Sequence, residues 1–192
     1  MTKVFISGSR EVSKLNKDLK TRINNIIQNG FLILIGDANG ADKAVQKYLS
    51  EQDYSNVIVF CMRGQCRNNI GSWKSKRVEV TEDKKGFDYY SIKDLEMAKE
   101  TDYGFLIWDA KSKGTLNNAI NLLKLNKKIL IYFYPDKNFY VMDAFDHLKR
   151  LLSKCDKTSL ELFEKKLHIS EILDESNDEQ STLAFAYEDA LR

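Results

Sequence analysis

Three glycine-containing loops in this sequence carry residue types that proteins use to bind phosphorylated ligands. The first reads Ser7-Gly8-Ser9-Arg10. Its glycine lets a ligand approach the backbone, its serines can donate hydroxyl hydrogens, and Arg10 can clamp a phosphate through two hydrogen bonds. Gly-Ser is also ordinary turn chemistry, so this loop indicates a ligand only in combination with others. We predict that Gly8, Ser9 and Arg10 contact the ligand.

The second loop (GDANGAD) begins at Gly36, and Gly40 stands at an expected helix start. Free backbone amides at a helix N-terminus attract anions. Asp37 and Asp42 would repel a phosphate, so we expect them to accept hydrogen bonds from a ribose or a base. We predict that Gly36, Gly40 and Ala41 also contact the ligand. Asp42 could instead simply cap the helix.

The third loop (DAKSKGT) again places a glycine at the expected start of a helix. With Ser112 and two lysines beside it, Gly114 forms either a phosphate cradle or a plain strand-to-helix turn. The spacing matches neither the GxxxxGK[ST] of a P-loop nor GxGxxG. We predict that Ser112, Gly114 and Thr115 bind the ligand, together with Asp109 before them and Asn118 after them.

A long segment without clear periodicity, residues 62–90, adds two more candidates. It holds three glycines and a cluster of basic side chains. Arg67 could reach a phosphate, and Trp73 could stack on a base. Trp73 could equally contact a partner protein or lie in the core. We interpret the segment as a long loop, with a short strand at 78–80 as an option.

The elements that must position these loops alternate between short apolar runs and helical spacing. The apolar runs cover residues 4–6, 31–35, 57–60, 103–108 and 129–134. Strands that are apolar on both faces and are each followed by a helix form parallel sheets covered on both sides. Ligands bind outside the carboxyl ends of such strands. We therefore predict a three-layer, Rossmann-like α/β fold with a mainly parallel five-stranded sheet.

The apolar spacing becomes helical after Pro135, the sole proline. We therefore assign residues 1–135 to a Rossmann-like nucleotide-binding domain and predict that residues 136–192 form a helical C-terminal extension packed on it. Residues 171–192 carry seven acidic side chains and one basic side chain. This imbalance indicates an acidic tail that faces away from an anionic ligand.

The composition argues against several classes of protein. The net charge of +2 over 192 residues is too close to zero to favour a nucleic-acid or membrane partner, and no apolar run approaches the length of about 18 residues that a membrane span needs. Three cysteines give an odd count without a CxxC pair, and two histidines make a His/Cys metal site improbable. We therefore expect a cytoplasmic protein with reduced thiols and no metal, and we do not expect membranes or nucleic acids as partners. A homo-oligomer is also expected.

The three loops together resemble the SLOG superfamily of Rossmann-like proteins. The residues that carry the resemblance are Gly8-Ser9-Arg10, Gly36-x-x-x-Gly40-Ala41-Asp42 and Gly114-Thr115, within residues 3–134. The superfamily includes the lonely-guy phosphoribohydrolases and the DNA-processing protein A fold, and the pattern is most similar to its small GSR…GxxGAD branch. The resemblance implies a nucleotide or nucleotide-derived ligand, such as one related to NAD or ADP-ribose, with no required cofactor.

This chain departs from the phosphoribohydrolases at their catalytic position. Those enzymes carry PGGxGTxxE, whereas here Asn118 stands in place of the glutamate and Lys111-Ser112-Lys113 replaces the leading Pro-Gly-Gly. An amide can act neither as a carboxylate nucleophile nor as a general base. The hydrolase activity of that branch therefore cannot be carried over.

Three functional hypotheses follow. The leading one is a binding module that senses, carries or sequesters a small-molecule nucleotide. The second is an N-glycosidase or nucleoside (deoxy)ribosyltransferase-like enzyme, with Asp109 as the best catalytic candidate and Asp37 and Asp42 behind it, although Asp109 could also just bind a ribose hydroxyl or cap the turn. The third is a single-stranded nucleic-acid binder, which Trp73 and the basic segment favour and the near-neutral net charge opposes.

Overall fold

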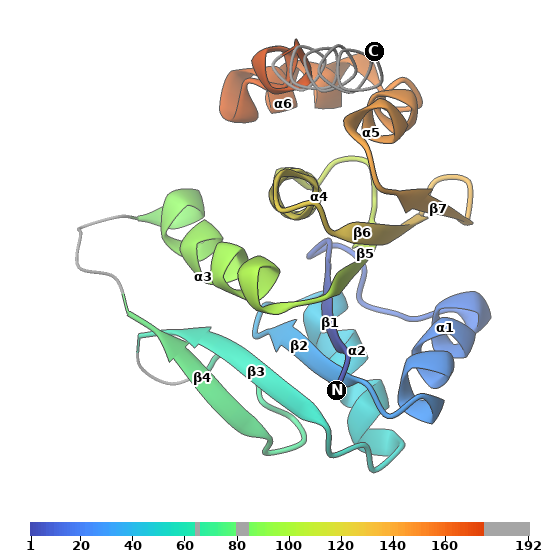
Figure 1. The fold of residues 1–192 in the computed structure, drawn as a ribbon, viewed down its shortest axis with the longest axis vertical. Coiled ribbons are helices and arrows are strands. Elements are labelled where there is room, and N and C mark those ends of the chain that lie inside the picture. Colours follow the sequence, from blue (N-terminus) through green and yellow to red (C-terminus); the bar gives the residue numbers. More distant parts are fainter. Residues whose placement is uncertain (64–65, 80–84, 175–192) are drawn as a thin grey trace, which may run out of the picture.

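The computed structural model of this chain describes residues 1–63, 66–79 and 85–174. Helices cover both faces of a seven-stranded sheet with the order β4-β3-β2-β1-β5-β6-β7 (Figure 1). The strands are β1 (Lys3–Gly8), β2 (Leu32–Gly36), β3 (Val57–Met62), β4 (Lys74–Val78), β5 (Tyr103–Trp108), β6 (Lys128–Phe133) and β7 (Asn138–Met142). The helices are α1 (Lys17–Gln28), α2 (Ala41–Glu51), α3 (Gly86–Glu100), α4 (Lys113–Lys124), α5 (Phe145–Leu152) and α6 (Lys157–Leu167). Strands β1 to β6 are parallel, and β7 is antiparallel to β6.

The sheet separates two hydrophobic cores because neighbouring residues of a strand point to opposite faces. In β1, Val4 and Ile6 belong to the core that α1 and α2 cover, whereas Phe5 belongs to the core under α3 and α4. All three side chains are fully buried. The strands therefore have to be apolar on both faces, which is the pattern that made them recognisable in the sequence.

The chain order reverses beside β1. Strands β2, β3 and β4 follow one another on one side of β1, and β5 and β6 lie on its other side. The loops after β1 and β5 consequently leave neighbouring strands at the same edge and lead to helices on opposite faces of the sheet. This topological switch point is where open α/β sheets bind their ligands.

The sheet has seven strands, so the predicted number of five is wrong. Strand β4 has the sequence KSKRV, of which only Val78 is buried, so it lacks the apolar run that marks a central strand. Strand β7 extends the sheet beyond residue 135, where the helical extension was expected to begin. The optional short strand at 78–80 overlaps β4 only at Val78, and β7 was not predicted. Both strands lie at the edges of the sheet, where one side of the strand has no neighbouring strand.

The expectation of reduced thiols is also wrong for two of the three cysteines. Cys61 at the end of β3 and Cys66 in the following loop form a disulfide, with their Cα atoms 5.1 Å apart. Cys155 is a free thiol and half-buried. The cysteine count and the missing CxxC pair could not reveal this bond, because it depends on the loop folding back toward the strand from which it leaves.

Helix α6 packs against α4, and helix α5 packs against β7. The indole of Trp108 and the ring of Phe163 lie 5.9 Å apart, which joins β5 to α6. The chain is helical again from residue 169 to 174. Most of the predicted acidic tail lies outside the described residues. Within the described part of the chain, no helix has both the length and the apolar character that crossing a membrane would require.

Candidate functional site

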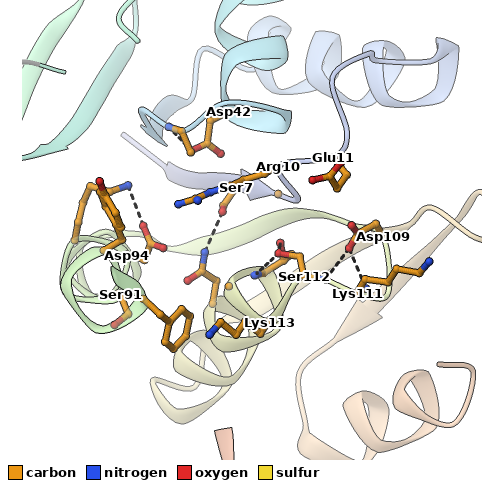
Figure 2. A pocket seen from close by; sticks show the side chains of 18 of the residues that line it. Ser7, Arg10, Glu11, Asp42, Ser91, Asp94, Asp109, Lys111, Ser112 and Lys113 are labelled. Carbon is orange, nitrogen blue, oxygen red and sulfur yellow. Dashed lines mark hydrogen bonds and ion pairs between the residues drawn. The ribbon is translucent and has the colours of Figure 1, made fainter. Parts of the chain in front are cut away.

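A cavity of about 550 Å³ opens at the carboxyl edge of the sheet, between the loops after β1, β2 and β5 and the helix α3 (Figure 2). Nine of the predicted ligand-binding residues line it: Gly8, Arg10, Asp42, Arg67, Asp109, Ser112, Gly114, Thr115 and Asn118. They come from four separate segments of the chain. The fold therefore brings most of the candidates to one place.

Four further candidates lie behind the cavity wall and shape it. The carbonyl of Ser9 accepts a hydrogen bond from the amide of Ala41 at 3.1 Å, so the first loop itself satisfies an amide at the N-terminus of α2. Gly40 adopts a φ of 80°, and a Cβ at this position would collide with the backbone of Arg10. Glycine is therefore required here for the two loops to meet. A Cβ on Gly36 would likewise collide with the Asp42 carboxylate.

The N-terminus of α4 offers an anion site at the mouth of the cavity. The hydroxyl of Ser112 caps the helix by accepting a hydrogen bond from the amide of Thr115 at 3.3 Å. The amides of Lys113 and Gly114, at the first two helical positions, have no carbonyl one turn earlier to bond. Only the Ser112 hydroxyl, at 3.9 Å, lies near the position that a Cβ of Gly114 would take. An anion can therefore approach these amides closely.

Asp109 is occupied by the turn that leads into α4. Its Oδ1 accepts hydrogen bonds from the Lys111 amide at 3.0 Å and the Ser112 amide at 2.8 Å (Figure 2). The same oxygen accepts a hydrogen bond from the Ser9 hydroxyl at 2.7 Å. This arrangement ties the first loop to the third. Asp109 thus lines the cavity as a carboxylate that orders two loops.

Arg67 is held by a carboxylate instead of standing free for a phosphate. Its guanidinium donates to Asp37 at 2.6 and 3.2 Å, and its backbone amide donates to the same carboxylate at 3.0 Å. The guanidinium also lies 4.3 Å from the ring centre of Tyr90. Although burial acts to raise the pKa of Asp37, the hydrogen bonds from Arg67 and the nearby charge of Lys93 hold it below its usual value.

A buried charge cluster forms the floor of the cavity. The ammonium of Lys93 is almost fully buried, 2.9 Å from Asp94 and 3.9 Å from Asp37. Burial acts to lower the pKa of Lys93, but the charges of Asp94 and Asp42 outweigh this effect and raise it. Burial raises the pKa of Asp42 to about 7, against the opposing charge of Lys93. The charge on Asp42 is therefore the most costly in the cluster.

Trp73 does not line the cavity. Its indole packs against the core on the α1 and α2 side and donates a hydrogen bond to the carbonyl of Tyr54 at 2.8 Å. The prediction that Trp73 stacks on a base therefore has no support in its position. Trp73 is partly buried and packs against that core, which is closer to its alternative interpretation as a core residue.

Sequence reasoning missed the contribution of α3, which supplies Phe87, Tyr90, Lys93 and Asp94 to the cavity. Tyr90, Lys93 and Met97 follow the i, i+3, i+7 spacing of one helix face, and Lys93 and Met97 are both buried. A lysine in a buried helical stripe is unusual. That signal was present, but only a placed helix shows that Lys93 faces carboxylates of another loop.

No protein-family model matches the chain, and no curated protein matches it. Among solved structures, it is similar to DNA processing protein A from Helicobacter pylori, whose structure is described as giving insights into a unique single-stranded DNA binding mode. The TM-score is 0.50 and the identity is 18%, with 68% of this chain and 64% of that chain covered. The match thus spans less than two thirds of the neighbour. It confirms the Rossmann-like α/β fold.

The same comparison corrects one expectation. The net charge of +2 was the reason for not expecting a nucleic-acid partner, yet a protein of this fold is described as binding single-stranded DNA. Net charge sums over the whole chain, whereas binding depends on the charges and shape of one surface. Near-neutrality is therefore no argument against nucleic acid here.

Proposed function

We propose that this chain binds a nucleotide or nucleotide-derived ligand, with its phosphate at the N-terminus of α4. The observation that carries the proposal is the cavity of about 550 Å³, in which one wall offers free helix amides and basic side chains and the floor offers oxygen acceptors. Lys111 and Lys113 stand on either side of Ser112 at the start of α4, and Arg10 lines the same cavity from the loop after β1. A volume of this size suits a small organic ligand of nucleotide size.

The finer assignment that we propose is a SLOG-type binding module for a ligand of the NAD or ADP-ribose class. The motifs after β1, β2 and β5 support it, because the fold brings them to one switch point. We propose binding without glycosidic cleavage. Asn118 supplies no carboxylate, and the Oδ1 of Asp109 is engaged by three donors.

Replacing Gly114 by valine should weaken nucleotide binding by at least about tenfold, or about 1.4 kcal/mol, while the protein stays folded. The branched side chain would cover the amides that face the phosphate, and the space around this position makes the variant compatible with the helix. Titration calorimetry with a panel of nucleoside 5′-phosphates and ADP-ribose measures the change.

The matched control is Asn117→Val, which adds the same side chain to α4 at a residue that does not line the cavity. Its affinity should equal that of the wild type. Unchanged affinity in a folded Gly114→Val protein would show that the phosphate does not bind at α4.

A second candidate function is binding of a single strand, with one of its nucleotides in the same cavity. The observation that favours it is the structural neighbour described as binding single-stranded DNA. Three basic residues line this cavity, Arg10, Lys111 and Lys113, and they could contact the phosphates of a strand.

If the strand is the ligand, a short oligonucleotide should bind more tightly than a mononucleotide, and its log affinity should fall with log salt concentration by about 0.7 for each phosphate contacted. Fluorescence anisotropy at several salt concentrations tests this expectation. If a mononucleotide and an oligonucleotide bind with equal affinity, and the slope of log affinity against log salt corresponds to one phosphate contact, the second candidate is rejected and the first is retained.

A further inference from the structure

Strand β7 ends the sheet with an edge that carries no charged residue. In the described part of the chain no strand pairs with its outer side, and Figure 1 shows β7 and β4 at opposite ends of the sheet. The sequence of β7 is NFYVM, whereas that of β4 is KSKRV. Natural edge strands are kept from pairing with other chains by charges, prolines or bulges. Strand β7 has no charge and no proline, and its register with β6 is continuous.

One face of β7 is apolar and partly uncovered. Val141 is 65% exposed and lies opposite Leu130 of β6. Leu130 and Phe139 are partly buried against the core on the α1 and α2 side. Helix α5 covers the other face, where its Leu148 shares a core with Met142. A partner at this edge would therefore remove the exposed parts of Val141 and Phe139 from water.

The sequence of β7 is complementary to itself in an antiparallel pair. Directly opposite residues in such a pair share a face of the sheet, so a twofold pair can be centred on Tyr140. Val141 of one copy then lies opposite Phe139 of the other, and symmetry makes this contact twice. Lys137 precedes the strand and Asp143 follows it, and both are exposed. Each end of the pair therefore brings a lysine of one copy beside an aspartate of the other.

Other registers of the same pair lose this match. A shift by one residue would place opposite side chains on different faces. A shift by two residues in one direction sets Val141 opposite Lys137, and a shift by two in the other direction sets Phe139 opposite Asp143. The register centred on Tyr140 is therefore the one in which apolar residues meet apolar residues and opposite charges meet.

We propose that the partner of this edge is a second copy of the chain, and that two copies form a symmetric dimer by antiparallel pairing of their β7 strands. The two sheets become one continuous sheet that ends in β4 on both sides. Each copy uses its β7 edge once, so the assembly is closed. An interface built on one strand pair is small, and its dissociation constant should be roughly micromolar.

Analytical ultracentrifugation of the full chain over a wide range of concentrations measures this dissociation constant. Val141→Lys should raise it at least about tenfold, because the substitution removes an apolar contact twice in each dimer. The exposure of Val141 makes the variant compatible with the fold. Ile70→Lys is the matched control, since it makes a similar change at an exposed apolar residue of the loop after β3. Its dissociation constant should equal that of the wild type.

A charge swap tests the register. Lys137→Asp sets two carboxylates together at each end of the pair and should weaken the dimer, and aspartate tolerates the positive φ of 55° at this position. Asp143→Lys sets two ammonium groups together and should also weaken it, besides removing the contact of 2.9 Å with His147. The double variant should recover most of the wild-type affinity. The two residues stand at opposite ends of one strand, so a role of either within its own chain would not be restored.

A wild type that stays monomeric at every concentration would overturn the inference. A dimer whose dissociation constant is unchanged in Val141→Lys would overturn it too, because that dimer would use another surface. A double variant that dimerises no better than the two single variants would reject the antiparallel register and the inference with it. None of these outcomes bears on the proposed ligand site, since the three substituted residues of β7 and its ends do not line the cavity.

Discussion

Replacing Lys93 by methionine should lower the free energy of unfolding by about 3–5 kcal/mol at pH 7.5. Methionine keeps most of the volume of the lysine and removes its charge, so that the carboxylates of Asp37, Asp42 and Asp94 lose the cation they share. Breaking a buried ion pair from one side leaves charges without compensation, and this costs more than losing an exposed pair. Urea denaturation measures the difference.

The control for this prediction is Lys99→Met, on the same helix. Lys99 is exposed and pairs with Glu96 at 2.8 Å, so its loss should change stability by no more than about 0.5 kcal/mol. The double variant Lys93→Met with Asp42→Asn should recover part of the stability, because one of the repelling charges is gone. Equal, small effects of the two lysine substitutions would contradict the described charge cluster.

The second large effect concerns pH. The pKa of Asp42 is about 7 in the folded protein and near 3.8 when unperturbed. Between these values the unfolded chain has lost a proton that the folded protein still holds, so the free energy of unfolding falls as pH rises. Over the whole window the loss is about 4 kcal/mol, since each pKa unit corresponds to about 1.4 kcal/mol. Below pH 3.8 and above pH 7 this residue should add no further slope.

The measurement compares the wild type with Asp42→Asn by urea denaturation from pH 4 to pH 8. The difference between the two proteins isolates Asp42, because groups that both share contribute equally. Asp37 lies outside the window, since its pKa is lowered. We expect the variant to gain stability over the wild type steadily up to about pH 7. A difference that does not vary with pH would show that Asp42 ionises normally.

The sequence was sufficient to place most of the candidate cavity. Gly8, Asp42 and Gly114 each follow an apolar run and begin or precede a helix, and parallel strands bring such loops to one edge. The residue types of the loops and the periodicity of the flanking segments agree with the fold at these positions, and together they located these residues. The number of strands could not be obtained in the same way, because edge strands do not need two apolar faces.

The roles of the residues in and around the cavity were harder to predict than their positions. Arg67 and Asp37 looked like two separate ligand contacts, but they bind each other. Trp73 was expected to stack on a base, but it packs partly buried against the core on the α1 and α2 side. The contribution of Lys93 and Tyr90 depends on α3 packing over the carboxyl edge of the sheet. Such pairings join residues that are distant in the chain, and residue type and spacing carry no information about them.

The basic composition of β4 affects how copies of this protein can associate. This strand lies at the edge of the sheet, so the backbone amides and carbonyls on its outer side could pair with a strand of another chain. Lys74, Lys76 and Arg77 make that border exposed and cationic. A second copy approaching strand to strand would bring like charges together and strip them of water. The basic edge therefore disfavours continuous growth of the sheet through β4.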